Sequence, residues 1–276
     1  MSYLKYKVSE TLAIARKEVL IDLRFSVAFL FQSIVSPVGR LVPILTVYAA
    51  TVGQNAVSPI PGITKETYLP FLAIGIIFNT IWRESTIIFF EKFKRDKWAR
   101  TIDLFFIAPV HTSAVISGMG ISVILRNIPT LLSFLIVLII ISPTTIFGFL
   151  VAFLSFLLVT VIGLSIGLIL GGVVLSSENT TPFLSYITAA FTFLTPFFYP
   201  VEVIAKLPTP FDHILTPLIK YNPLNSALNV ARTAWLGSGP VPVMDLLYVF
   251  VVALSLVLIS GNIFRFIWRR FGIQTG

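Results

Sequence analysis

The chain has 276 residues, of which 56% are hydrophobic, and it carries a formal net charge of +8. A soluble globular domain needs a largely polar exterior, so this much apolar surface excludes an ordinary soluble fold and indicates a protein of the lipid bilayer. The chain contains no cysteine, which excludes disulfides, thiol catalysis and thiolate metal sites.

Residues 1–26 predict an amphipathic helix that lies flat on the membrane surface. Apolar side chains recur there at spacings of three and four and form one stripe: Val8, Leu12, Ala15, Val19 and Leu23. Because the segment is basic and directly precedes an apolar run, we expect an interfacial helix half-sunk in the inner leaflet. A simple charged lead-in to the membrane is the alternative.

Six stretches are apolar enough to cross or enter a bilayer, which predicts an all-α polytopic membrane protein with six transmembrane helices. They cover residues 27–52, 68–90, 114–141, 146–175, 183–199 and 244–264. The fifth has 17 residues and reaches only about 25 Å, so we expect it to be tilted, or broken and re-entrant. In the fourth, Gly163, Gly167 and Gly171 form a small-residue stripe suited to close contact with another helix.

Basic residues predict which side of the membrane each connection occupies. The N-terminus, the loop after the second span, the loop after the fourth span and the C-terminal tail contain 13 of the 20 lysines and arginines. Basic residues in short flanking loops stay cytoplasmic, so we expect a plasma-membrane protein with both termini inside the cell. Attraction to anionic membrane lipids then explains the net charge, and no nucleic-acid partner is expected.

The segment 91–110, between the second and third spans, is the most charged part of the chain. Seven charged residues precede the amphipathic run 101–106, which contains Leu104, Phe105 and Phe106 and stops before Pro109. Apolar residues on a cytoplasmic loop usually have a partner. We therefore expect a short cytoplasmic helix that contacts another protein.

The segment 200–242, predicted to lie outside the cell, contains seven prolines with semi-apolar pieces between them. It is too apolar for a free loop and too interrupted for a span. We expect short helices over residues 211–221 and 223–236 that cap the outer face or dip into it. No internal repeat or second domain is visible, so residues 1–276 are interpreted as a single domain.

Ionisable residues inside the predicted spans are candidates for a transport path. Arg40, Glu84 and Arg126 lie well within apolar stretches. A charge at the bilayer centre costs at least about 2.5 kcal/mol, so such groups face the protein interior or water. They would line a path that accepts an anionic headgroup. The structural alternative is that the arginines pair with Glu84 or with backbone carbonyls freed by prolines.

No catalytic constellation is recognisable. The two histidines are predicted on opposite faces of the membrane, carboxylates are dispersed, and no GxxxxGK[ST] phosphate loop is present. We therefore expect that this chain is not an enzyme, holds no metal or cofactor of its own and does not hydrolyse ATP by itself.

Two sets of residues resemble the type-2 ABC transporter permease family over essentially the whole chain. Arg95-Asp96, 101–104 and 108–110 stand in place of the family's charged "RE…GTLE.L…PV" loop, and 197–201, 207–208, 222–224 and Arg232 are similar to its "fyP…lP…nPl…R" stretch. The chain departs from the pattern at Arg100, where the family usually has glycine. The loop 176–182 also lacks a basic residue that is often present.

This resemblance implies six helices per subunit, a connecting helix at 1–26, a coupling loop at 91–110 and outer re-entrant helices at 200–242. It implies two copies of a separate ABC ATP-binding subunit, which would bind ATP and Mg, and a second permease subunit that forms a homodimer with this one. The implied contacts to the ATPase are Arg95, Asp96, Arg100, Thr101, Asp103, Leu104, Phe105, Phe106 and Glu178. The implied outer gate contains Tyr199, Pro200, Asn222, Pro223 and Arg232.

The expected function is thus a permease subunit of an ATP-driven exporter for an amphipathic substrate: a drug-like molecule, a lipid or a lipid-linked glycan. The alternatives are a partner-independent channel or secondary transporter, and a membrane-embedded transferase. The first is disfavoured by the lack of intramembrane acid or histidine chains and of an inverted repeat. The second would need clustered His, Asp or Glu at one interface.

Overall fold

The computed structural model describes residues 3–24, 26–31, 35, 39, 42–43, 46, 64–101, 110–176, 181–199, 201 and 212–274. Every regular element within these ranges is a helix, which confirms the all-α prediction for this part of the chain. In chain order the helices are α1 (Tyr3–Leu23), α2 (Ser26–Leu30), α4 (Lys65–Trp98), α6 (Thr112–Ile141), α7 (Ile146–Ser176), α8 (Thr181–Leu194), α10 (Asp212–Lys220), α11 (Pro223–Leu236) and α12 (Val243–Gln274).

Four of the described helices, α4, α6, α7 and α12, are long and apolar enough to cross a membrane. They correspond to the second, third, fourth and sixth predicted spans, whereas the first predicted span lies largely outside the described residues. The fifth corresponds to α8, which ends at Leu194 and not at Tyr199. With 14 residues, α8 extends about 21 Å, short of a hydrocarbon core of about 30 Å.

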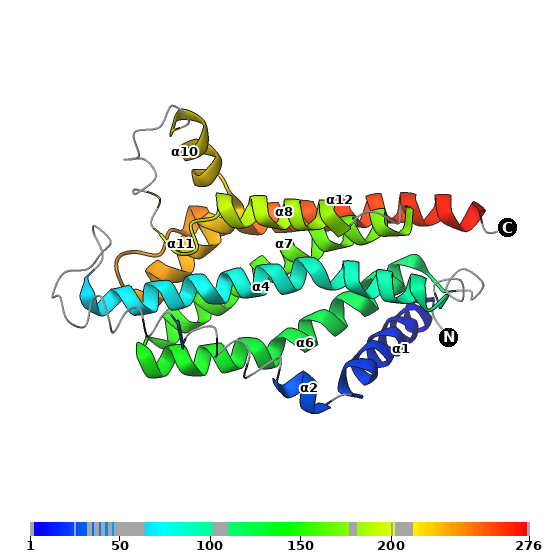
Figure 1. Ribbon diagram of the computed structural model, residues 1–276, viewed down its shortest axis with the longest axis horizontal. Helices are drawn as coiled ribbons and strands as arrows, with labels where there is room; N and C mark the ends of the chain where they lie inside the picture. The colour runs from blue at the N-terminus through cyan, green and yellow to red at the C-terminus, as the bar shows by residue number, and fades with distance from the viewer. Residues whose placement is uncertain are drawn as a thin grey trace.

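The long helices run along the molecule and define two ends (Figure 1). α4, α7 and α12 all begin near α11 and finish at the end where α1 begins and where the described C-terminal helix stops. We call these the α11 end and the α1 end. Both termini of the described chain therefore lie at the α1 end.

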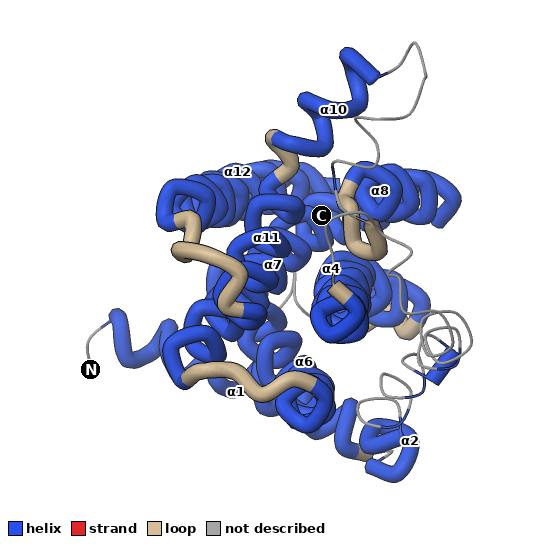
Figure 2. The backbone as a smooth tube through the Cα atoms, turned by 90° about the vertical axis from the view of Figure 1, so that its left-hand side faces the viewer, coloured by secondary structure: helices blue, strands red, loops and turns tan. Residues whose placement is uncertain are grey.

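Helix α7 is the centre of the bundle, with α4, α11 and α12 packed around it (Figure 2). A Cβ atom added at Gly163 would lie 2.8 Å from the Ser85 Cβ, and one added at Gly167 would lie 2.5 Å from the Thr86 carbonyl oxygen. These distances are closer than real Cβ contacts allow, so α4 and α7 lie too close together for a larger residue to fit at either glycine. The predicted small-residue stripe is confirmed as the face of α7 that contacts α4.

Burial separates the inner helices from the outer ones. Phe78 and Phe156 are fully buried where α4 meets α7, and Trp82 is fully buried beside Phe191 of α8. In contrast, α12 turns Phe250, Leu254 and other large apolar side chains outward. A helix that is apolar on its exposed face as well as its packed face fits a lipid surrounding.

The predicted N-terminal helix is present as α1, but the side that it turns to the protein overlaps the apolar stripe only in part. Ile14 and Glu18 are buried against α6 and α4, whereas Val8 and Leu12, both in the predicted stripe, are 51% and 58% exposed. The stripe therefore overlaps the packed face at Ala15, which is buried, whereas Val8, Leu12 and Leu23 remain accessible, as an interfacial helix requires.

Helix α4 continues beyond the predicted end of the second span. Residues 91–98, expected in the loop, extend the helix to Trp98. Three charged side chains of this extension, Lys92, Arg95 and Asp96, have partners on α1, described below. Residues 102–109, with the Leu-Phe-Phe surface, lie outside the described residues, so the predicted coupling helix is not observed.

The segment after α8 forms two short helices, as the proline spacing predicts. α11 has the predicted bounds, and α10 begins one residue after the predicted start. Asn222 is the N-cap of α11: its side chain accepts a hydrogen bond from the Leu224 amide at 3.0 Å. Helix α11 packs on α7, α12 and α4 at the α11 end.

Candidate functional site

A cavity of about 800 Å³ lies between α4 and α8. Its apolar wall is rich in aromatic rings, among them Phe90, Phe193 and Phe198. The polar side chains that line it are Asn79, Arg83, Glu91, Lys94, Thr188, Thr192 and Tyr199. Pockets of this size and mixed lining are typical of sites for small amphipathic molecules.

Asn79 and Arg83 give this cavity its polar character along the middle of α4. The Asn79 Oδ1 atom is buried and accepts no hydrogen bond from the rest of the described chain. Arg83, one helical turn further on, is exposed. Lys94 lies 5.9 Å from the centre of the Phe90 ring and 5.6 Å from that of Trp98, so cation–π contacts hold its ammonium near the α1 end. The cavity thus offers aromatic surface, one unsatisfied acceptor and cationic groups along one helix.

A cluster of charged side chains joins α1 to α4 at the α1 end. Glu18, which is 0% exposed, is its centre. Its Oε2 atom lies 3.1 Å from the Lys92 Nζ and accepts a hydrogen bond from the Arg95 Nη2 at 2.9 Å. Lys17 approaches both Glu18 and Asp96, at 3.1 and 3.9 Å. We call these five residues the Glu18 cluster.

The cluster extends to a third helix through its buried lysine. Lys92, 2% exposed, donates a hydrogen bond to the Ser122 Oγ of α6 at 2.7 Å. Ser122 in turn donates to the Met119 carbonyl oxygen at 2.7 Å. One ammonium group therefore connects α1, α4 and α6.

The electrostatics of Glu18 show how strongly the cluster holds the carboxylate. Burial by itself raises the pKa of a carboxyl group, because the charged form loses its hydration. Attraction to Lys92, together with the hydrogen bond and charge of Arg95 and the charge of Lys17, outweighs burial and lowers the pKa of Glu18 from 4.5 to about 2. Glu18 is therefore ionised at every physiological pH.

Two further acidic residues of α1 bind α6 and its N-terminal edge. Asp22 accepts a hydrogen bond from the Arg126 Nη1 at 3.1 Å. Glu10 lies 3.0 Å from the His111 Nδ1 and 3.4 Å from the His111 backbone nitrogen. Glu10, Glu18 and Asp22 occur at spacings of eight and four, which places them on one face of α1. This face attaches α1 to the bundle along its length.

At the α11 end, Arg232 joins three segments. It is 8% exposed, donates from Nη1 to the Pro196 carbonyl oxygen at 3.2 Å, and donates from Nη2 to the carbonyl oxygens of Phe197 and Phe71 at 2.7 and 3.3 Å. Its guanidinium carbon lies 3.5 Å from the centre of the Phe71 ring. Asn222 adds hydrogen bonds to Leu194 and Thr195. The two side chains therefore fix α11 against α4 and the segment that follows α8.

The structure describes some of the predicted site residues and not others. Arg40, Asp103, Leu104, Phe105, Phe106, Glu178 and Pro200 lie outside the described residues. Among the predicted path residues, Arg126 binds Asp22, and half-buried Glu84 is not among the residues that line the α4–α8 cavity. Of the predicted ATPase contacts, Arg95 and buried Asp96 face α1. Tyr199 lines the α4–α8 cavity and donates to the Phe193 carbonyl oxygen at 2.9 Å.

Arg100, where the resembled family usually has glycine, adopts a glycine-like backbone. Its φ is 54°, in the left-handed region. The Arg100 amide donates to the Lys97 carbonyl oxygen at 3.1 Å and the Thr101 amide to that of Asp96 at 2.9 Å. This pair of bonds is the Schellman motif, in which glycine is favoured at the left-handed position. The left-handed turn at the end of α4 is thus present although arginine, and not glycine, occupies it.

Sequence reasoning missed the residues that carry most of this charge network. Glu10, Glu18, Lys92 and His111 were not singled out, because each is an ordinary charged residue beside the membrane. The acidic residues on one face of α1 were the signal that could have predicted these contacts. The apolar stripe of the same helix was interpreted instead. Within the described ranges, no three His, Asp or Glu side chains gather as a metal site would require.

In the part of the chain that the structure describes, every regular element is a helix, and four long apolar helices indicate a multi-pass membrane protein. Comparison with known proteins adds no family: no family model matches the chain, and no curated protein matches it.

Proposed function

We propose that the chain is the permease subunit of an ATP-driven exporter similar to the type-2 ABC transporters. Its substrate is amphipathic: a drug-like molecule, a lipid or a lipid-linked glycan. The observation that carries this proposal is the α4–α8 cavity, where Asn79 and Arg83 bring polar groups into an otherwise aromatic and aliphatic surface. Such a lining fits a molecule with an apolar body and a polar or anionic group.

The proposed membrane arrangement has six spans in the plasma membrane, with both termini in the cytoplasm. The segment 27–52 and α8 add the first and fifth spans to the four long helices. The α1 end is cytoplasmic in this arrangement, which agrees with the basic side chains gathered there. Helices α10 and α11 are the outer re-entrant helices, and α1 is the interfacial connecting helix.

Coupling to ATP is proposed to pass through the α1 end. Two copies of a separate ATPase subunit bind ATP and Mg and contact the segment 102–106, which directly follows the Schellman turn of α4. A second copy of this permease completes the path. The Glu18 cluster supports this role, because it joins α4 to α1 and α6 close to that contact. A displacement of the loop would then move three helices together.

The test uses the permease purified with its ATPase and reconstituted in liposomes. Phe105→Asp should abolish substrate-stimulated ATP hydrolysis without changing the amount of folded permease, because it places a charge on the contact surface. Arg83→Leu should reduce export of an anionic amphiphile more than export of a neutral one. Arg269→Leu, which changes an exposed arginine that does not line the cavity, is the matched control.

Two results would contradict this function. Substrate flux through liposomes that contain the permease alone, independent of ATP, would establish a channel or secondary transporter. Equal loss of anionic and neutral export in Arg83→Leu would remove the cavity from the transport path.

A further inference from the structure

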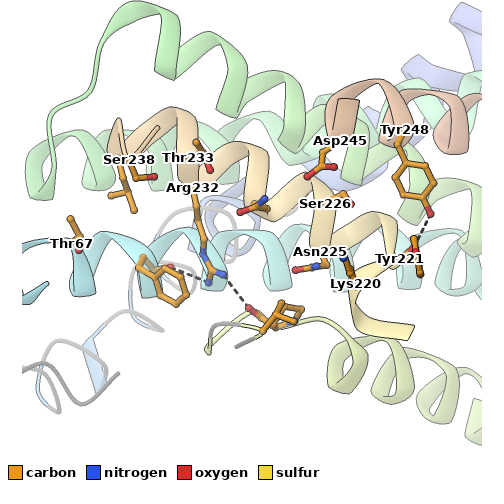
Figure 3. A pocket seen from close by; sticks show the side chains of 15 residues that line it. Thr67, Lys220, Tyr221, Asn225, Ser226, Arg232, Thr233, Ser238, Asp245 and Tyr248 are labelled. Carbon is orange, nitrogen blue, oxygen red and sulfur yellow. Dashed lines mark hydrogen bonds between the residues drawn. The ribbon is translucent and has the colours of Figure 1, made fainter. Parts of the chain in front are cut away.

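A second cavity, also about 800 Å³, lies at the α11 end among α11, α4 and α12 (Figure 3). It shares no lining residue with the α4–α8 cavity. Thr67 reaches it from α4, and Asp245 and Tyr248 reach it from α12. Polar side chains from three helices therefore converge on one hollow.

Helix α11 supplies the longest polar wall. Asn225, Asn229 and Thr233 line the cavity at intervals of four residues, so they form a stripe along one face of the helix. The opposite face is apolar: Leu228 and Trp235 are buried in the core. The orientation of α11 is thus set by its core face, and this holds the amide stripe towards the cavity.

The walls are fixed before any ligand arrives. Arg232 is held by three carbonyl oxygens and stacks on Phe71, as described above. Across the cavity, the Tyr248 hydroxyl donates to the Tyr221 carbonyl oxygen at 2.7 Å and connects α12 to the end of α10 (Figure 3). A pre-organised site loses little entropy when a ligand binds.

The lining chemistry indicates the class of ligand. Three charged side chains line the cavity, Arg232, Lys220 and Asp245, and the two Nη atoms of Arg232 already donate to backbone carbonyl oxygens. Most other polar groups are neutral amides and hydroxyls, which both donate and accept hydrogen bonds. A sugar hydroxyl does the same, so it can pair with each of these groups as donor or as acceptor.

We propose that this cavity is a binding site for a neutral polyhydroxylated ligand, the sugar group of a carbohydrate. The exposed ring of Tyr221 at its margin provides an apolar face for the carbon side of a pyranose. The site is independent of the proposed export function, since it uses other residues at the other end of α4.

The test uses the full chain in lipid nanodiscs, because an alkyl glycoside detergent would itself present sugar. Maltose, sucrose and N-acetylglucosamine are titrated by calorimetry, with inorganic phosphate and glycine betaine as the anionic and zwitterionic comparisons. We expect saturable binding of at least one sugar. Asn229→Leu should weaken the affinity for that sugar about tenfold or more, since the ligand hydroxyls would lose their hydrogen bonds to the Asn229 amide. Asn262→Leu, the same change at an exposed position of α12 away from the cavity, should bind as wild type does.

Thr233→Val provides a second variant of almost unchanged shape, so that a folding defect in Asn229→Leu cannot obscure the result. The proposal is overturned if none of the three sugars binds saturably, or if phosphate or glycine betaine binds more tightly than every sugar. It is also overturned if neither cavity variant weakens the sugar. Each of these outcomes leaves the ATP-coupling experiment unaffected, so the two proposals fail separately.

Discussion

Removal of the buried charge at Glu18 is the most direct test of how α1 is attached. In Glu18→Gln the side chain keeps its shape and an acceptor oxygen, but the buried Lys92 ammonium loses the carboxylate charge that lies 3.1 Å from it. Breaking a buried ion pair from one side costs about 3–5 kcal/mol, mostly because the other charge stays uncompensated.

The lowered pKa of Glu18 gives a second way to obtain the size of this destabilisation. A change from 4.5 to about 2 in the pKa of Glu18, at about 1.4 kcal/mol per unit, corresponds to about 3 kcal/mol of folded-state stabilisation. For a chain of 276 residues, such a loss lowers the Tm by roughly 5 °C.

The assay is thermal unfolding of the purified protein followed by tryptophan fluorescence. Glu91→Gln, the same substitution at an exposed position of α4, should leave the Tm within about 1 °C of wild type. The double variant Glu18→Gln/Lys92→Met removes both charges and should recover most of the lost stability. A Tm unchanged by Glu18→Gln, or no recovery in the double variant, would refute the role of the cluster.

Wild type and Glu18→Gln also test how the stabilisation by Glu18 depends on pH. The folded pKa of Glu18, about 2, lies below the ordinary value of 4.5, so its contribution is complete above about pH 4.5 and is lost as the pH falls towards 2. The Tm difference between wild type and Glu18→Gln should therefore narrow across that window. A constant difference from pH 6 to pH 2 would show that the carboxylate charge does not stabilise the fold.

Two backbone predictions follow from the helix contacts. Gly167→Ala should destabilise the protein by about 1–3 kcal/mol in the same unfolding assay, because its methyl would meet the Thr86 carbonyl oxygen, whereas Gly120→Ala, with open space around it, should be neutral or slightly stabilising. Arg100→Gly should raise the stability by roughly 0.5–1 kcal/mol, because it removes the cost of a left-handed non-glycine residue at the end of α4. A neutral Gly167→Ala would show that α4 and α7 are further apart than described, and a destabilising Arg100→Gly would show that the arginine side chain outweighs its backbone strain.

The long helices could be predicted well from the sequence because their signal is local. The apolar runs at 114–141 and 146–175 match α6 and α7 within two residues, and the proline spacing gives the bounds of α11. Length and hydrophobicity decide such elements, since a bilayer requires a continuous apolar helix whatever its neighbours are.

The second and fifth spans show where local signals are insufficient. Charged residues after residue 90 predicted a loop, but α4 continues to Trp98 because α1 supplies partners for Lys92 and Arg95. Conversely, apolar residues up to 199 predicted a longer span, but α8 ends at Leu194, whose carbonyl oxygen accepts a hydrogen bond from Asn222. In both cases a residue distant in sequence determines where the helix ends.

The sequence by itself therefore determined the helical class, most of the apolar helices and the glycine face of α7. Only the tertiary structure decided which charges meet: Glu18 with Arg95, and Asp22 with Arg126, are 77 and 104 residues apart in the chain. The physical reason is that periodicity shows which residues share a helix face, but not which other helix that face will meet. That choice depends on how all the helices pack together.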